Sequence, residues 1–151
     1  MDDGNGIKYG LSPNPYLEVQ RERDALHMAM LPGVSGKMYK GVKRESNSVW
    51  QNSGYGLYMT SQICRNGGDF LIVSNGACLL LSADSKEDLN VNYKGTSLRL
   101  RINTTKVENY SGMLSKFRRE GAAVAKELSG FYAIEPSVAS TMLMRDFQGA
   151  C

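Results

Sequence analysis

Two closely spaced glycines, Gly54 and Gly56, open a segment whose apolar residues recur at helical spacing. Because glycine has no side chain, the backbone N–H groups of such a turn can crowd round an anion, and the start of the helix adds partial positive charge. Tyr55 and Leu57 complete the motif, Gly-Tyr-Gly-Leu. The pattern is typical of a phosphate site, although it is weak alone because many helices begin after glycine.

The segment before these glycines carries four cations within eight positions: Lys37, Lys40, Lys43 and Arg44. Ammonium groups at this place could neutralise the charge of a phosphate, and Lys40 is the candidate contact. The alternative is that all four are solvated surface charges, as charge runs usually are.

Two further motifs combine glycine with a polar side chain. Asp2-Asp3-Gly4-Asn5-Gly6-Ile7 sets a carboxylate beside two glycines, which let the backbone pass close to a ligand. Read alone, it is a plain turn. Gly95-Thr96 places a hydroxyl at the start of an alternating segment, where such a group usually satisfies nearby backbone.

The sequence Gly-Val-Ser-Gly-Lys over 33–37 lacks the spacing of a phosphate-binding P-loop. Leu31 stands where that motif needs its first glycine, and Met38 follows the lysine instead of Ser or Thr. A P-loop nucleotide site is therefore excluded.

The cysteines do not indicate a disulfide framework or a metal centre. They are odd in number and widely spaced, and the single histidine, His27, has no Cys or His at ligand spacing. We therefore expect His27 at the surface or its boundary and Cys64 in packing. The three cysteines are Cys64, Cys78 and Cys151.

The composition fits one globular domain: 151 residues, 42% hydrophobic and 22% charged. A net charge of +3 is too small to predict nucleic-acid binding, and the basic residues between 99 and 119 are balanced by glutamates. The first residues do not resemble a secretory leader, and the longest apolar run, 77–81, is far too short to span a bilayer. The sequence predicts a cytoplasmic location, no membrane segment and no nucleic-acid partner.

Hydrophobic periodicity predicts the elements of the first half of the chain. Residues 8–14 are expected to be a loop, and a helix is expected over about 16–30, ended by Pro32-Gly33. The polar stretch 33–55 shows no period and is predicted to be a long mobile loop.

The second half alternates between strand and helix patterns. A short helix from Gly56 to about residue 66 precedes strands over 69–74 and 77–82, joined by the tight-turn pair Asn75-Gly76. A polar loop is predicted over 83–94. A strand is predicted over 96–103, with Leu98, Leu100 and Ile102 turned inward and Arg99 and Arg101 turned outward. Helices are expected over 111–128 and about 136–147.

The order of these weak motifs is more specific than any one of them. An Asp-x-Gly-x-Gly-Ile turn, a helix, a polar loop, Gly-x-Gly-Leu, a helix ending in Gly-Gly, a hairpin and a Gly-Thr strand follow one another. This order resembles the C-terminal two-thirds of the GHKL ATP-binding (Bergerat) fold of gyrase, heat-shock chaperone ATPases, histidine kinases and MutL. The resemblance covers residues 1–103, and 54–68 is its most specific part.

The resemblance implies an α+β two-layer sandwich, in which helices cover a mixed or antiparallel sheet. Residues 1–103 would form a partial Bergerat fold, with an ATP lid over about 8–53. Residues 104–151 would be a helical C-terminal extension.

The resemblance also implies roles for individual residues at the base of the nucleotide. Asp2 matches the carboxylate that accepts the adenine amino group. Gly4 and Gly6, followed by Ile7, match the glycines that pass under the base. Thr96 matches the hydroxyl near adenine.

At the phosphate end, Gly54 and Gly56 match the glycines that cradle the phosphates, with Tyr55 and Leu57 in the same motif. Lys40 of the lid has no fixed counterpart in the family. The implied cofactors are ATP and Mg²⁺.

One family motif has no counterpart in this chain. In the family, a helix upstream of the Asp-x-Gly-x-Gly turn carries a Glu that activates water and an Asn that holds Mg²⁺. This chain starts at the turn itself, so we expect an N-terminally truncated domain, with Met1 an internal methionine of a longer protein and the Mg²⁺ ligand upstream. No catalytic or metal-binding residue is assigned within the chain.

Two functional hypotheses remain open. In the first, the chain is an ATP-binding module of a GHKL ATPase or protein kinase, and it binds ATP or ADP. In the second, it is a non-catalytic protein-interaction domain with a degenerate nucleotide site. In either case, residues 104–151 could contact a protein partner or the rest of the parent chain.

Overall fold

The structure is a computed structural model that describes residues 4–39, 41–42, 53–106 and 109–128. Its elements are the helices α1 (Gly6–Leu11), α2 (Glu22–Ala29), α3 (Gly56–Arg65) and α4 (Tyr110–Leu128), a 3-10 turn at Thr104–Lys106, and the strands β1 (Asp69–Ser74), β2 (Ala77–Leu81), β3 (Lys86–Asn90) and β4 (Thr96–Arg101).

The four strands form one antiparallel sheet in the order β3-β2-β1-β4. The predicted hairpin between β1 and β2 is confirmed. Asn75 has a φ of 39° and Gly76 a φ of 92°. Two consecutive residues with positive φ suit the twist of a two-residue hairpin, which explains why Asn-Gly stands here.

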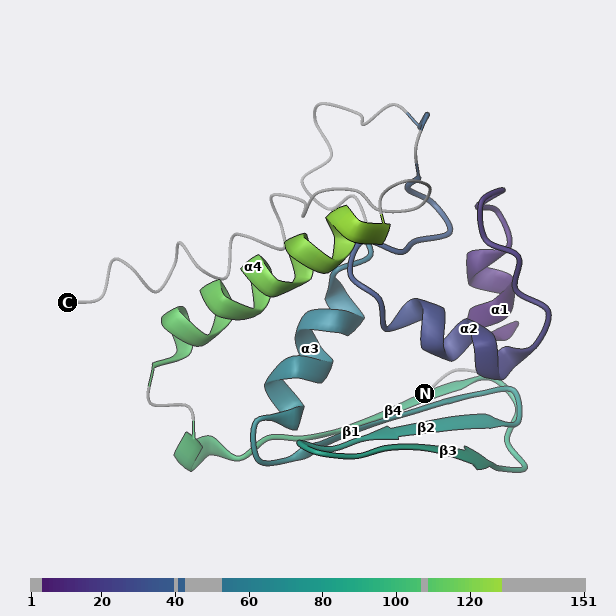
Figure 1. Ribbon diagram of the computed structural model, residues 1–151. Coiled ribbons are helices and arrows are strands. Elements are labelled where there is room, and N and C mark those ends of the chain that lie inside the picture. Colours follow the sequence, from purple (N-terminus) through teal and green to yellow (C-terminus); the bar gives the residue numbers. More distant parts are fainter. Residues whose placement is uncertain (1–3, 40, 43–52, 107–108, 129–151) are drawn as a thin grey trace.

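Helices α1, α2 and α3 lie on one face of the sheet, and α4 lies beyond α3 (Figure 1). Phe70, Ile72 and Leu79 of the two central strands are fully buried, together with Leu26 of α2 and Cys64 of α3. The predicted α+β class, the antiparallel sheet and its helical cover are therefore confirmed.

Helix α4 packs on α3 through a small contact that the sequence signals only in part. Tyr55, Tyr58 and Ala125 form a buried cluster. A Cβ added at Gly121 would lie 2.6 Å from the ring of Tyr58, so this glycine lets the two helices approach. The predicted helix over 111–128 is confirmed, whereas the one over 136–147 lies outside the described residues.

The predicted helix over 16–30 is wrong in its first third, since α2 begins only at Glu22. The side-chain oxygen of Asn14 accepts a hydrogen bond from the Tyr16 N–H at 3.0 Å, which fixes a turn. Leu17 and Val19 then pack on the core from an irregular segment. The sequence places Leu17 and Val19 on one face of a helix, but both lie in a segment that is not helical.

Two predicted loops contain regular structure. Residues 8–14 were assigned to a loop by their glycine and proline content, but α1 runs from Gly6 to Leu11. Residues 83–94 contain β3, a strand whose five residues are all exposed to solvent to some extent. A polar sequence without alternation gives no local signal for a strand. β3 is therefore determined by its pairing with β2.

The alternating strand lies where the sequence predicts, but its apolar side chains are not buried. Leu98 and Leu100 pair directly with Ile72 and Phe70, so they share the face that the helices cover. They are nevertheless 47% and 49% exposed. The reason is that β4 is an edge strand, while α2 and α3 lie over β1 and β2.

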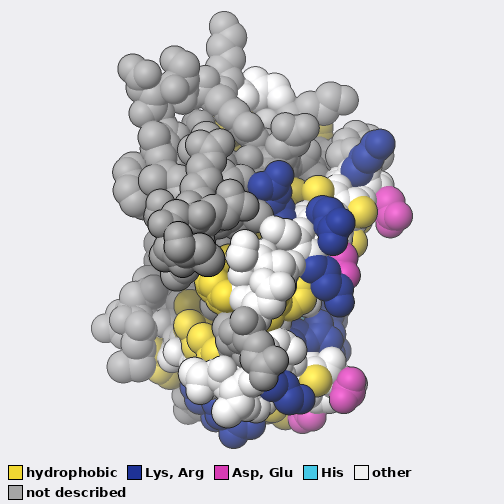
Figure 2. All heavy atoms as spheres, turned by 90° about the vertical axis from the view of Figure 1, so that its left-hand side faces the viewer, with side chains coloured by type: hydrophobic (Ala, Val, Ile, Leu, Met, Phe, Trp, Pro, Cys, Tyr) yellow, Lys and Arg dark blue, Asp and Glu magenta, His cyan; other side chains and the backbone are white. Residues whose placement is uncertain are grey.

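No helix in the described part of the chain is both long and apolar enough to cross a membrane. Figure 2 shows Lys and Arg side chains along one margin and the lower end of the face that it views, with uncharged and apolar side chains between them. On this face, the positive charge is therefore spread rather than gathered in one block.

Helix α2 is tied to the sheet edge by charge. Asp88 of β3 lies 2.7 Å from the guanidinium of Arg23 and 2.6 Å from Nε2 of His27. The hydrogen bond with His27, helped by Arg23, holds the pKa of the Asp88 carboxyl below its usual range. His27 is thus a partly exposed partner of a carboxylate, as its place on an amphipathic helix predicts.

We predict that truncating a core leucine costs far more than truncating one on the edge strand. Leu79→Ala removes a fully buried side chain and should lower the free energy of unfolding by about 2–5 kcal/mol. Leu100→Ala, at a half-exposed position, should cost less than about 1 kcal/mol. Urea denaturation measures both, and equal losses would contradict the edge position of β4.

We also predict an acid-dependent contribution from Asp88. A carboxyl whose pKa is lowered by folding stabilises the protein above its usual pKa, near pH 4, and loses that contribution as pH falls through the folded value. Asp88→Asn should therefore reduce stability at pH 7 by no more than about 1 kcal/mol, since the pair is partly exposed. The gap between wild type and variant should close below about pH 4 in urea titrations. A gap independent of pH would contradict this linkage.

Candidate functional site

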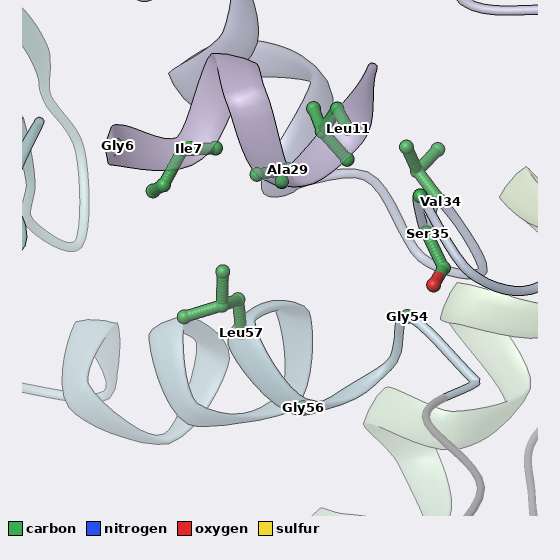
Figure 3. Close-up of a pocket in the computed structure, with 11 residues that line it drawn as sticks. Gly6, Ile7, Leu11, Ala29, Val34, Ser35, Gly54, Gly56 and Leu57 are labelled. Atoms are coloured by element: carbon green, nitrogen blue, oxygen red, sulfur yellow. The ribbon is translucent and has the colours of Figure 1, made fainter. Parts of the chain in front are cut away.

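A pocket of about 490 Å³ lies between α1, the loop after α2 and the start of α3. Figure 3 shows these three segments facing one another across it. Pockets of this size commonly hold small ligands. Five of the eleven lining residues are glycines, so much of the wall is main chain: Gly6, Gly10, Gly36, Gly54 and Gly56.

Backbone segments touch at two points of this wall. A Cβ added at Gly36 would overlap the carbonyl oxygen of Gly10 on α1. A Cβ added at Gly54 would overlap the carbonyl oxygen of Val34, and Gly54 also has a φ of 74°, which favours glycine. The pocket therefore keeps its shape only if these two positions carry no side chain.

The loop that carries Val34 and Gly36 is anchored from below. The Asn14 side-chain amide, 1% exposed, donates to the carbonyl oxygen of Ser35 at 2.9 Å. The Ser35 hydroxyl accepts hydrogen bonds from the N–H groups of Lys37 and Met38. Residues 33–39 contain no helix or strand, as the predicted loop requires, and most of them are buried.

The first turn of α3 lines one side of the pocket (Figure 3). Gly56 is its first residue, and Tyr55, the residue before it, makes no side-chain cap. Among the described residues, none of the first turn is acidic. The N–H groups of a first helical turn lack partners within the helix and carry partial positive charge, so this end of the pocket favours an anion.

Polar contacts to the sheet position α1. The N–H of Ile7 donates to the Ser74 hydroxyl at 2.8 Å, and that hydroxyl donates to Glu22 Oε2 at 2.9 Å. The same Glu22 oxygen accepts the N–H of Lys8 at 3.3 Å. Ser74 is fully buried, so this network fixes the pocket wall against the end of β1. Nothing in the sequence signals the roles of Ser74 and Glu22.

The structure brings five of the predicted site residues together. They come from two segments nearly fifty positions apart, and all of them line the pocket: Gly6, Ile7, Gly54, Gly56 and Leu57. Gly4, by contrast, precedes α1 and is not among the lining residues.

Tyr55 and Thr96 lie apart from the pocket. The ring of Tyr55 is 1% exposed and meets Tyr58 edge-on, with centroids 6.5 Å apart, so it serves the contact with α4. Thr96 starts β4 and pairs with Ser74. Asp2 and Lys40 lie outside the described residues.

Six lining residues were not predicted from the sequence: Gly10, Leu11, Ala29, Val34, Ser35 and Gly36. Leu11, Ala29 and Val34 belong to one buried cluster, so they are both core and pocket wall. Gly10 and Gly36 carry no local signal, because each matters only through the approach of the other segment.

Neither a cysteine thiol nor a metal centre lines this pocket among the described residues. Burial raises the pKa of the Cys64 and Cys78 thiols, which favours the unreactive protonated form. No group of three or more His, Cys, Asp or Glu side chains able to hold a metal occurs in the described ranges. What the site offers is binding through backbone and helix end.

Comparisons with protein-family models, with curated proteins and with solved structures found no match for this chain.

We predict that two facing glycines respond oppositely to the same substitution. Gly36→Ala places a methyl group against the Gly10 carbonyl and should lower the free energy of unfolding by about 1–3 kcal/mol. Gly10→Ala, with nothing within 4 Å of the new atom and an ordinary φ, should be neutral or stabilise α1 by up to about 1 kcal/mol. Chemical denaturation measures both. Equal effects would contradict the close approach of the two segments.

Proposed function

We propose that the pocket binds ATP and that the chain is a nucleotide-binding module of the GHKL type. One observation carries the proposal: glycine backbone from three segments and the N-terminus of α3 line a single pocket. A triphosphate needs this kind of surface, because N–H groups can approach its oxygens closely where no Cβ intervenes.

The residues present suit the two ends of a nucleotide. Gly54 and Gly56 would hold the phosphates at the start of α3, where the helix adds partial positive charge. The apolar wall of Ile7 and Leu11 would contact the base or sugar. Side chains added at Gly36 or Gly54 would fill space already taken by backbone, so the cradle tolerates only glycine there.

The proposal covers binding and assigns no catalytic step. When bound, the triphosphate supplies the phosphoryl group that GHKL enzymes hydrolyse or transfer. Among the described residues, no cluster of metal ligands accompanies the pocket, so Mg²⁺ would enter with the phosphates and with ligands from elsewhere in the protein. This chain's own part is to bind and orient the nucleotide.

Calorimetric titration with ATP and ADP in the presence of Mg²⁺ tests the proposal. Gly56→Ala adds a methyl group at the rim of the pocket in open space, so the fold should remain intact. Affinity for ATP should fall about tenfold or more, equivalent to about 1.4 kcal/mol. Gln62→Ala, further along α3 and outside the pocket lining, is the matched control and should bind as wild type does.

A second arm tests the adenine end. Asp2→Asn should abolish the preference for ATP over GTP, because the carboxylate that accepts the adenine amino group is lost. Absence of ATP and ADP binding by the folded wild-type chain would overturn the proposal and favour the protein-interaction hypothesis. Unchanged binding by Gly56→Ala would remove this pocket from consideration.

A further inference from the structure

The two edges of the sheet differ in how they meet solvent. The β3 edge begins with three charged residues, Lys86, Glu87 and Asp88. Charged side chains protect an edge strand from pairing with other chains. Among the described residues, no strand pairs with the outer edge of β4 and no charged side chain protects its helix side, and alternate N–H and C=O groups of an edge strand point away from the sheet.

An apolar row runs along β4. Leu98, Leu100 and Ile102 are 47%, 49% and 47% exposed, and they account for three of the seven large exposed hydrophobic residues in the described chain. Leu98 and Leu100 lie directly beside the fully buried Ile72 and Phe70. The hydrophobic core therefore continues to the open edge, where solvent meets it.

The reverse face of β4 carries surplus positive charge. Arg99 and Arg101 both pair with one carboxylate, that of Asp69, at 2.8 Å and 2.7 Å. The Asp69 side chain is 7% exposed, whereas those of the two arginines are 59% and 73% exposed. Two cations thus share one buried anion, and both guanidinium groups remain accessible from outside.

We infer that β4 is a docking edge for an extended peptide segment of a partner protein in which apolar and acidic residues alternate. Residues directly opposite in neighbouring strands share a face of the sheet. An incoming strand would therefore set its apolar side chains against Leu98 and Leu100 and its carboxylates against Arg99 and Arg101. Main-chain hydrogen bonds to the open edge give affinity, and this alternation gives specificity.

Charge argues against a second copy of this chain as the occupant. The antiparallel self-pairing that sets Leu98 of one copy opposite Leu100 of the other is centred on Arg99, so it also sets Arg99 opposite the Arg99 of the other copy. Like charges directly opposite destabilise a strand pair. An acidic strand replaces this repulsion with ion pairs, so the reverse face of β4 selects the partner.

The docking edge is separate from the nucleotide pocket. The pocket is lined by residues of α1, α2, α3 and the loop after α2, and no residue of β4 contributes to it. Peptide binding should therefore persist without ATP, and the two proposals can fail independently.

Fluorescence anisotropy with labelled eight-residue peptides tests the inference on the full chain. A peptide of alternating Val and Glu should bind, and one of alternating Val and Lys should bind at least about tenfold more weakly, a difference of about 1.4 kcal/mol. A peptide of the same Val and Glu content in two blocks should also bind more weakly, since it cannot match both faces. Added salt should weaken binding of the acidic peptide.

Leu100→Lys should reduce binding of the acidic alternating peptide at least about tenfold by removing apolar contact at the edge. Leu89→Lys is the matched control, because Leu89 is 44% exposed on the opposite edge strand, β3. It should leave binding unchanged, and circular dichroism should show both variants folded. If Leu100→Lys unfolds the chain, Leu98→Thr replaces it.

Three outcomes would overturn the inference. The first is absence of binding by the acidic alternating peptide. The second is equal loss in the Leu100→Lys and Leu89→Lys variants, which would place the peptide elsewhere. The third is a wild-type dimer in sedimentation that Leu100→Lys converts to monomer, which would make a second copy the occupant.

Discussion

Contact between bare backbones governs the shape of the candidate pocket. Gly36 lies against the carbonyl of Gly10, and Gly54 lies against the carbonyl of Val34, at distances that leave no room for a Cβ. Segments distant in sequence are thereby brought into direct main-chain contact. The surface they form is largely main chain, with the first turn of α3 on one side.

The same elements build the core and the pocket. Ile7 and Leu57 line the pocket and also pack against both buried clusters under the helices, so the floor of the site is the upper layer of the core. The turn that carries the two site glycines also contacts α4, because the side chain of Tyr55 is buried against that helix. A change in the seating of α3 would therefore reach the core, the pocket and α4 together.

The elements that sequence predicts well are those with strong local signals. The pair Asn75-Gly76 predicts the hairpin because both residues tolerate the positive φ that its turn requires, and the Gly-x-Gly pair predicts the start of α3. Where tertiary pairing decides, prediction fails: β3 is a strand only because β2 lies beside it, and nothing near Gly36 indicates that its neighbour is 26 positions earlier. Alternation also identifies the inner face of β4 but not whether anything covers it. Half of the expected site residues line one pocket. Each motif is local in sequence, whereas the pocket is formed by contacts between distant segments, so the motifs alone do not specify which of their residues line it.

The hydrogen bond from Ile7 to Ser74 bears on the order in which the chain assembles. It joins residues 67 positions apart, whereas the strands β1 and β2 meet across a two-residue turn. Closing a long loop costs more conformational entropy than closing a short one, and distant contacts form late. We expect the β1–β2 hairpin to form first and to serve as the template on which α1 docks. The ligand-binding surface would then be the last part of the fold to mature, so that competence to bind reports completed folding.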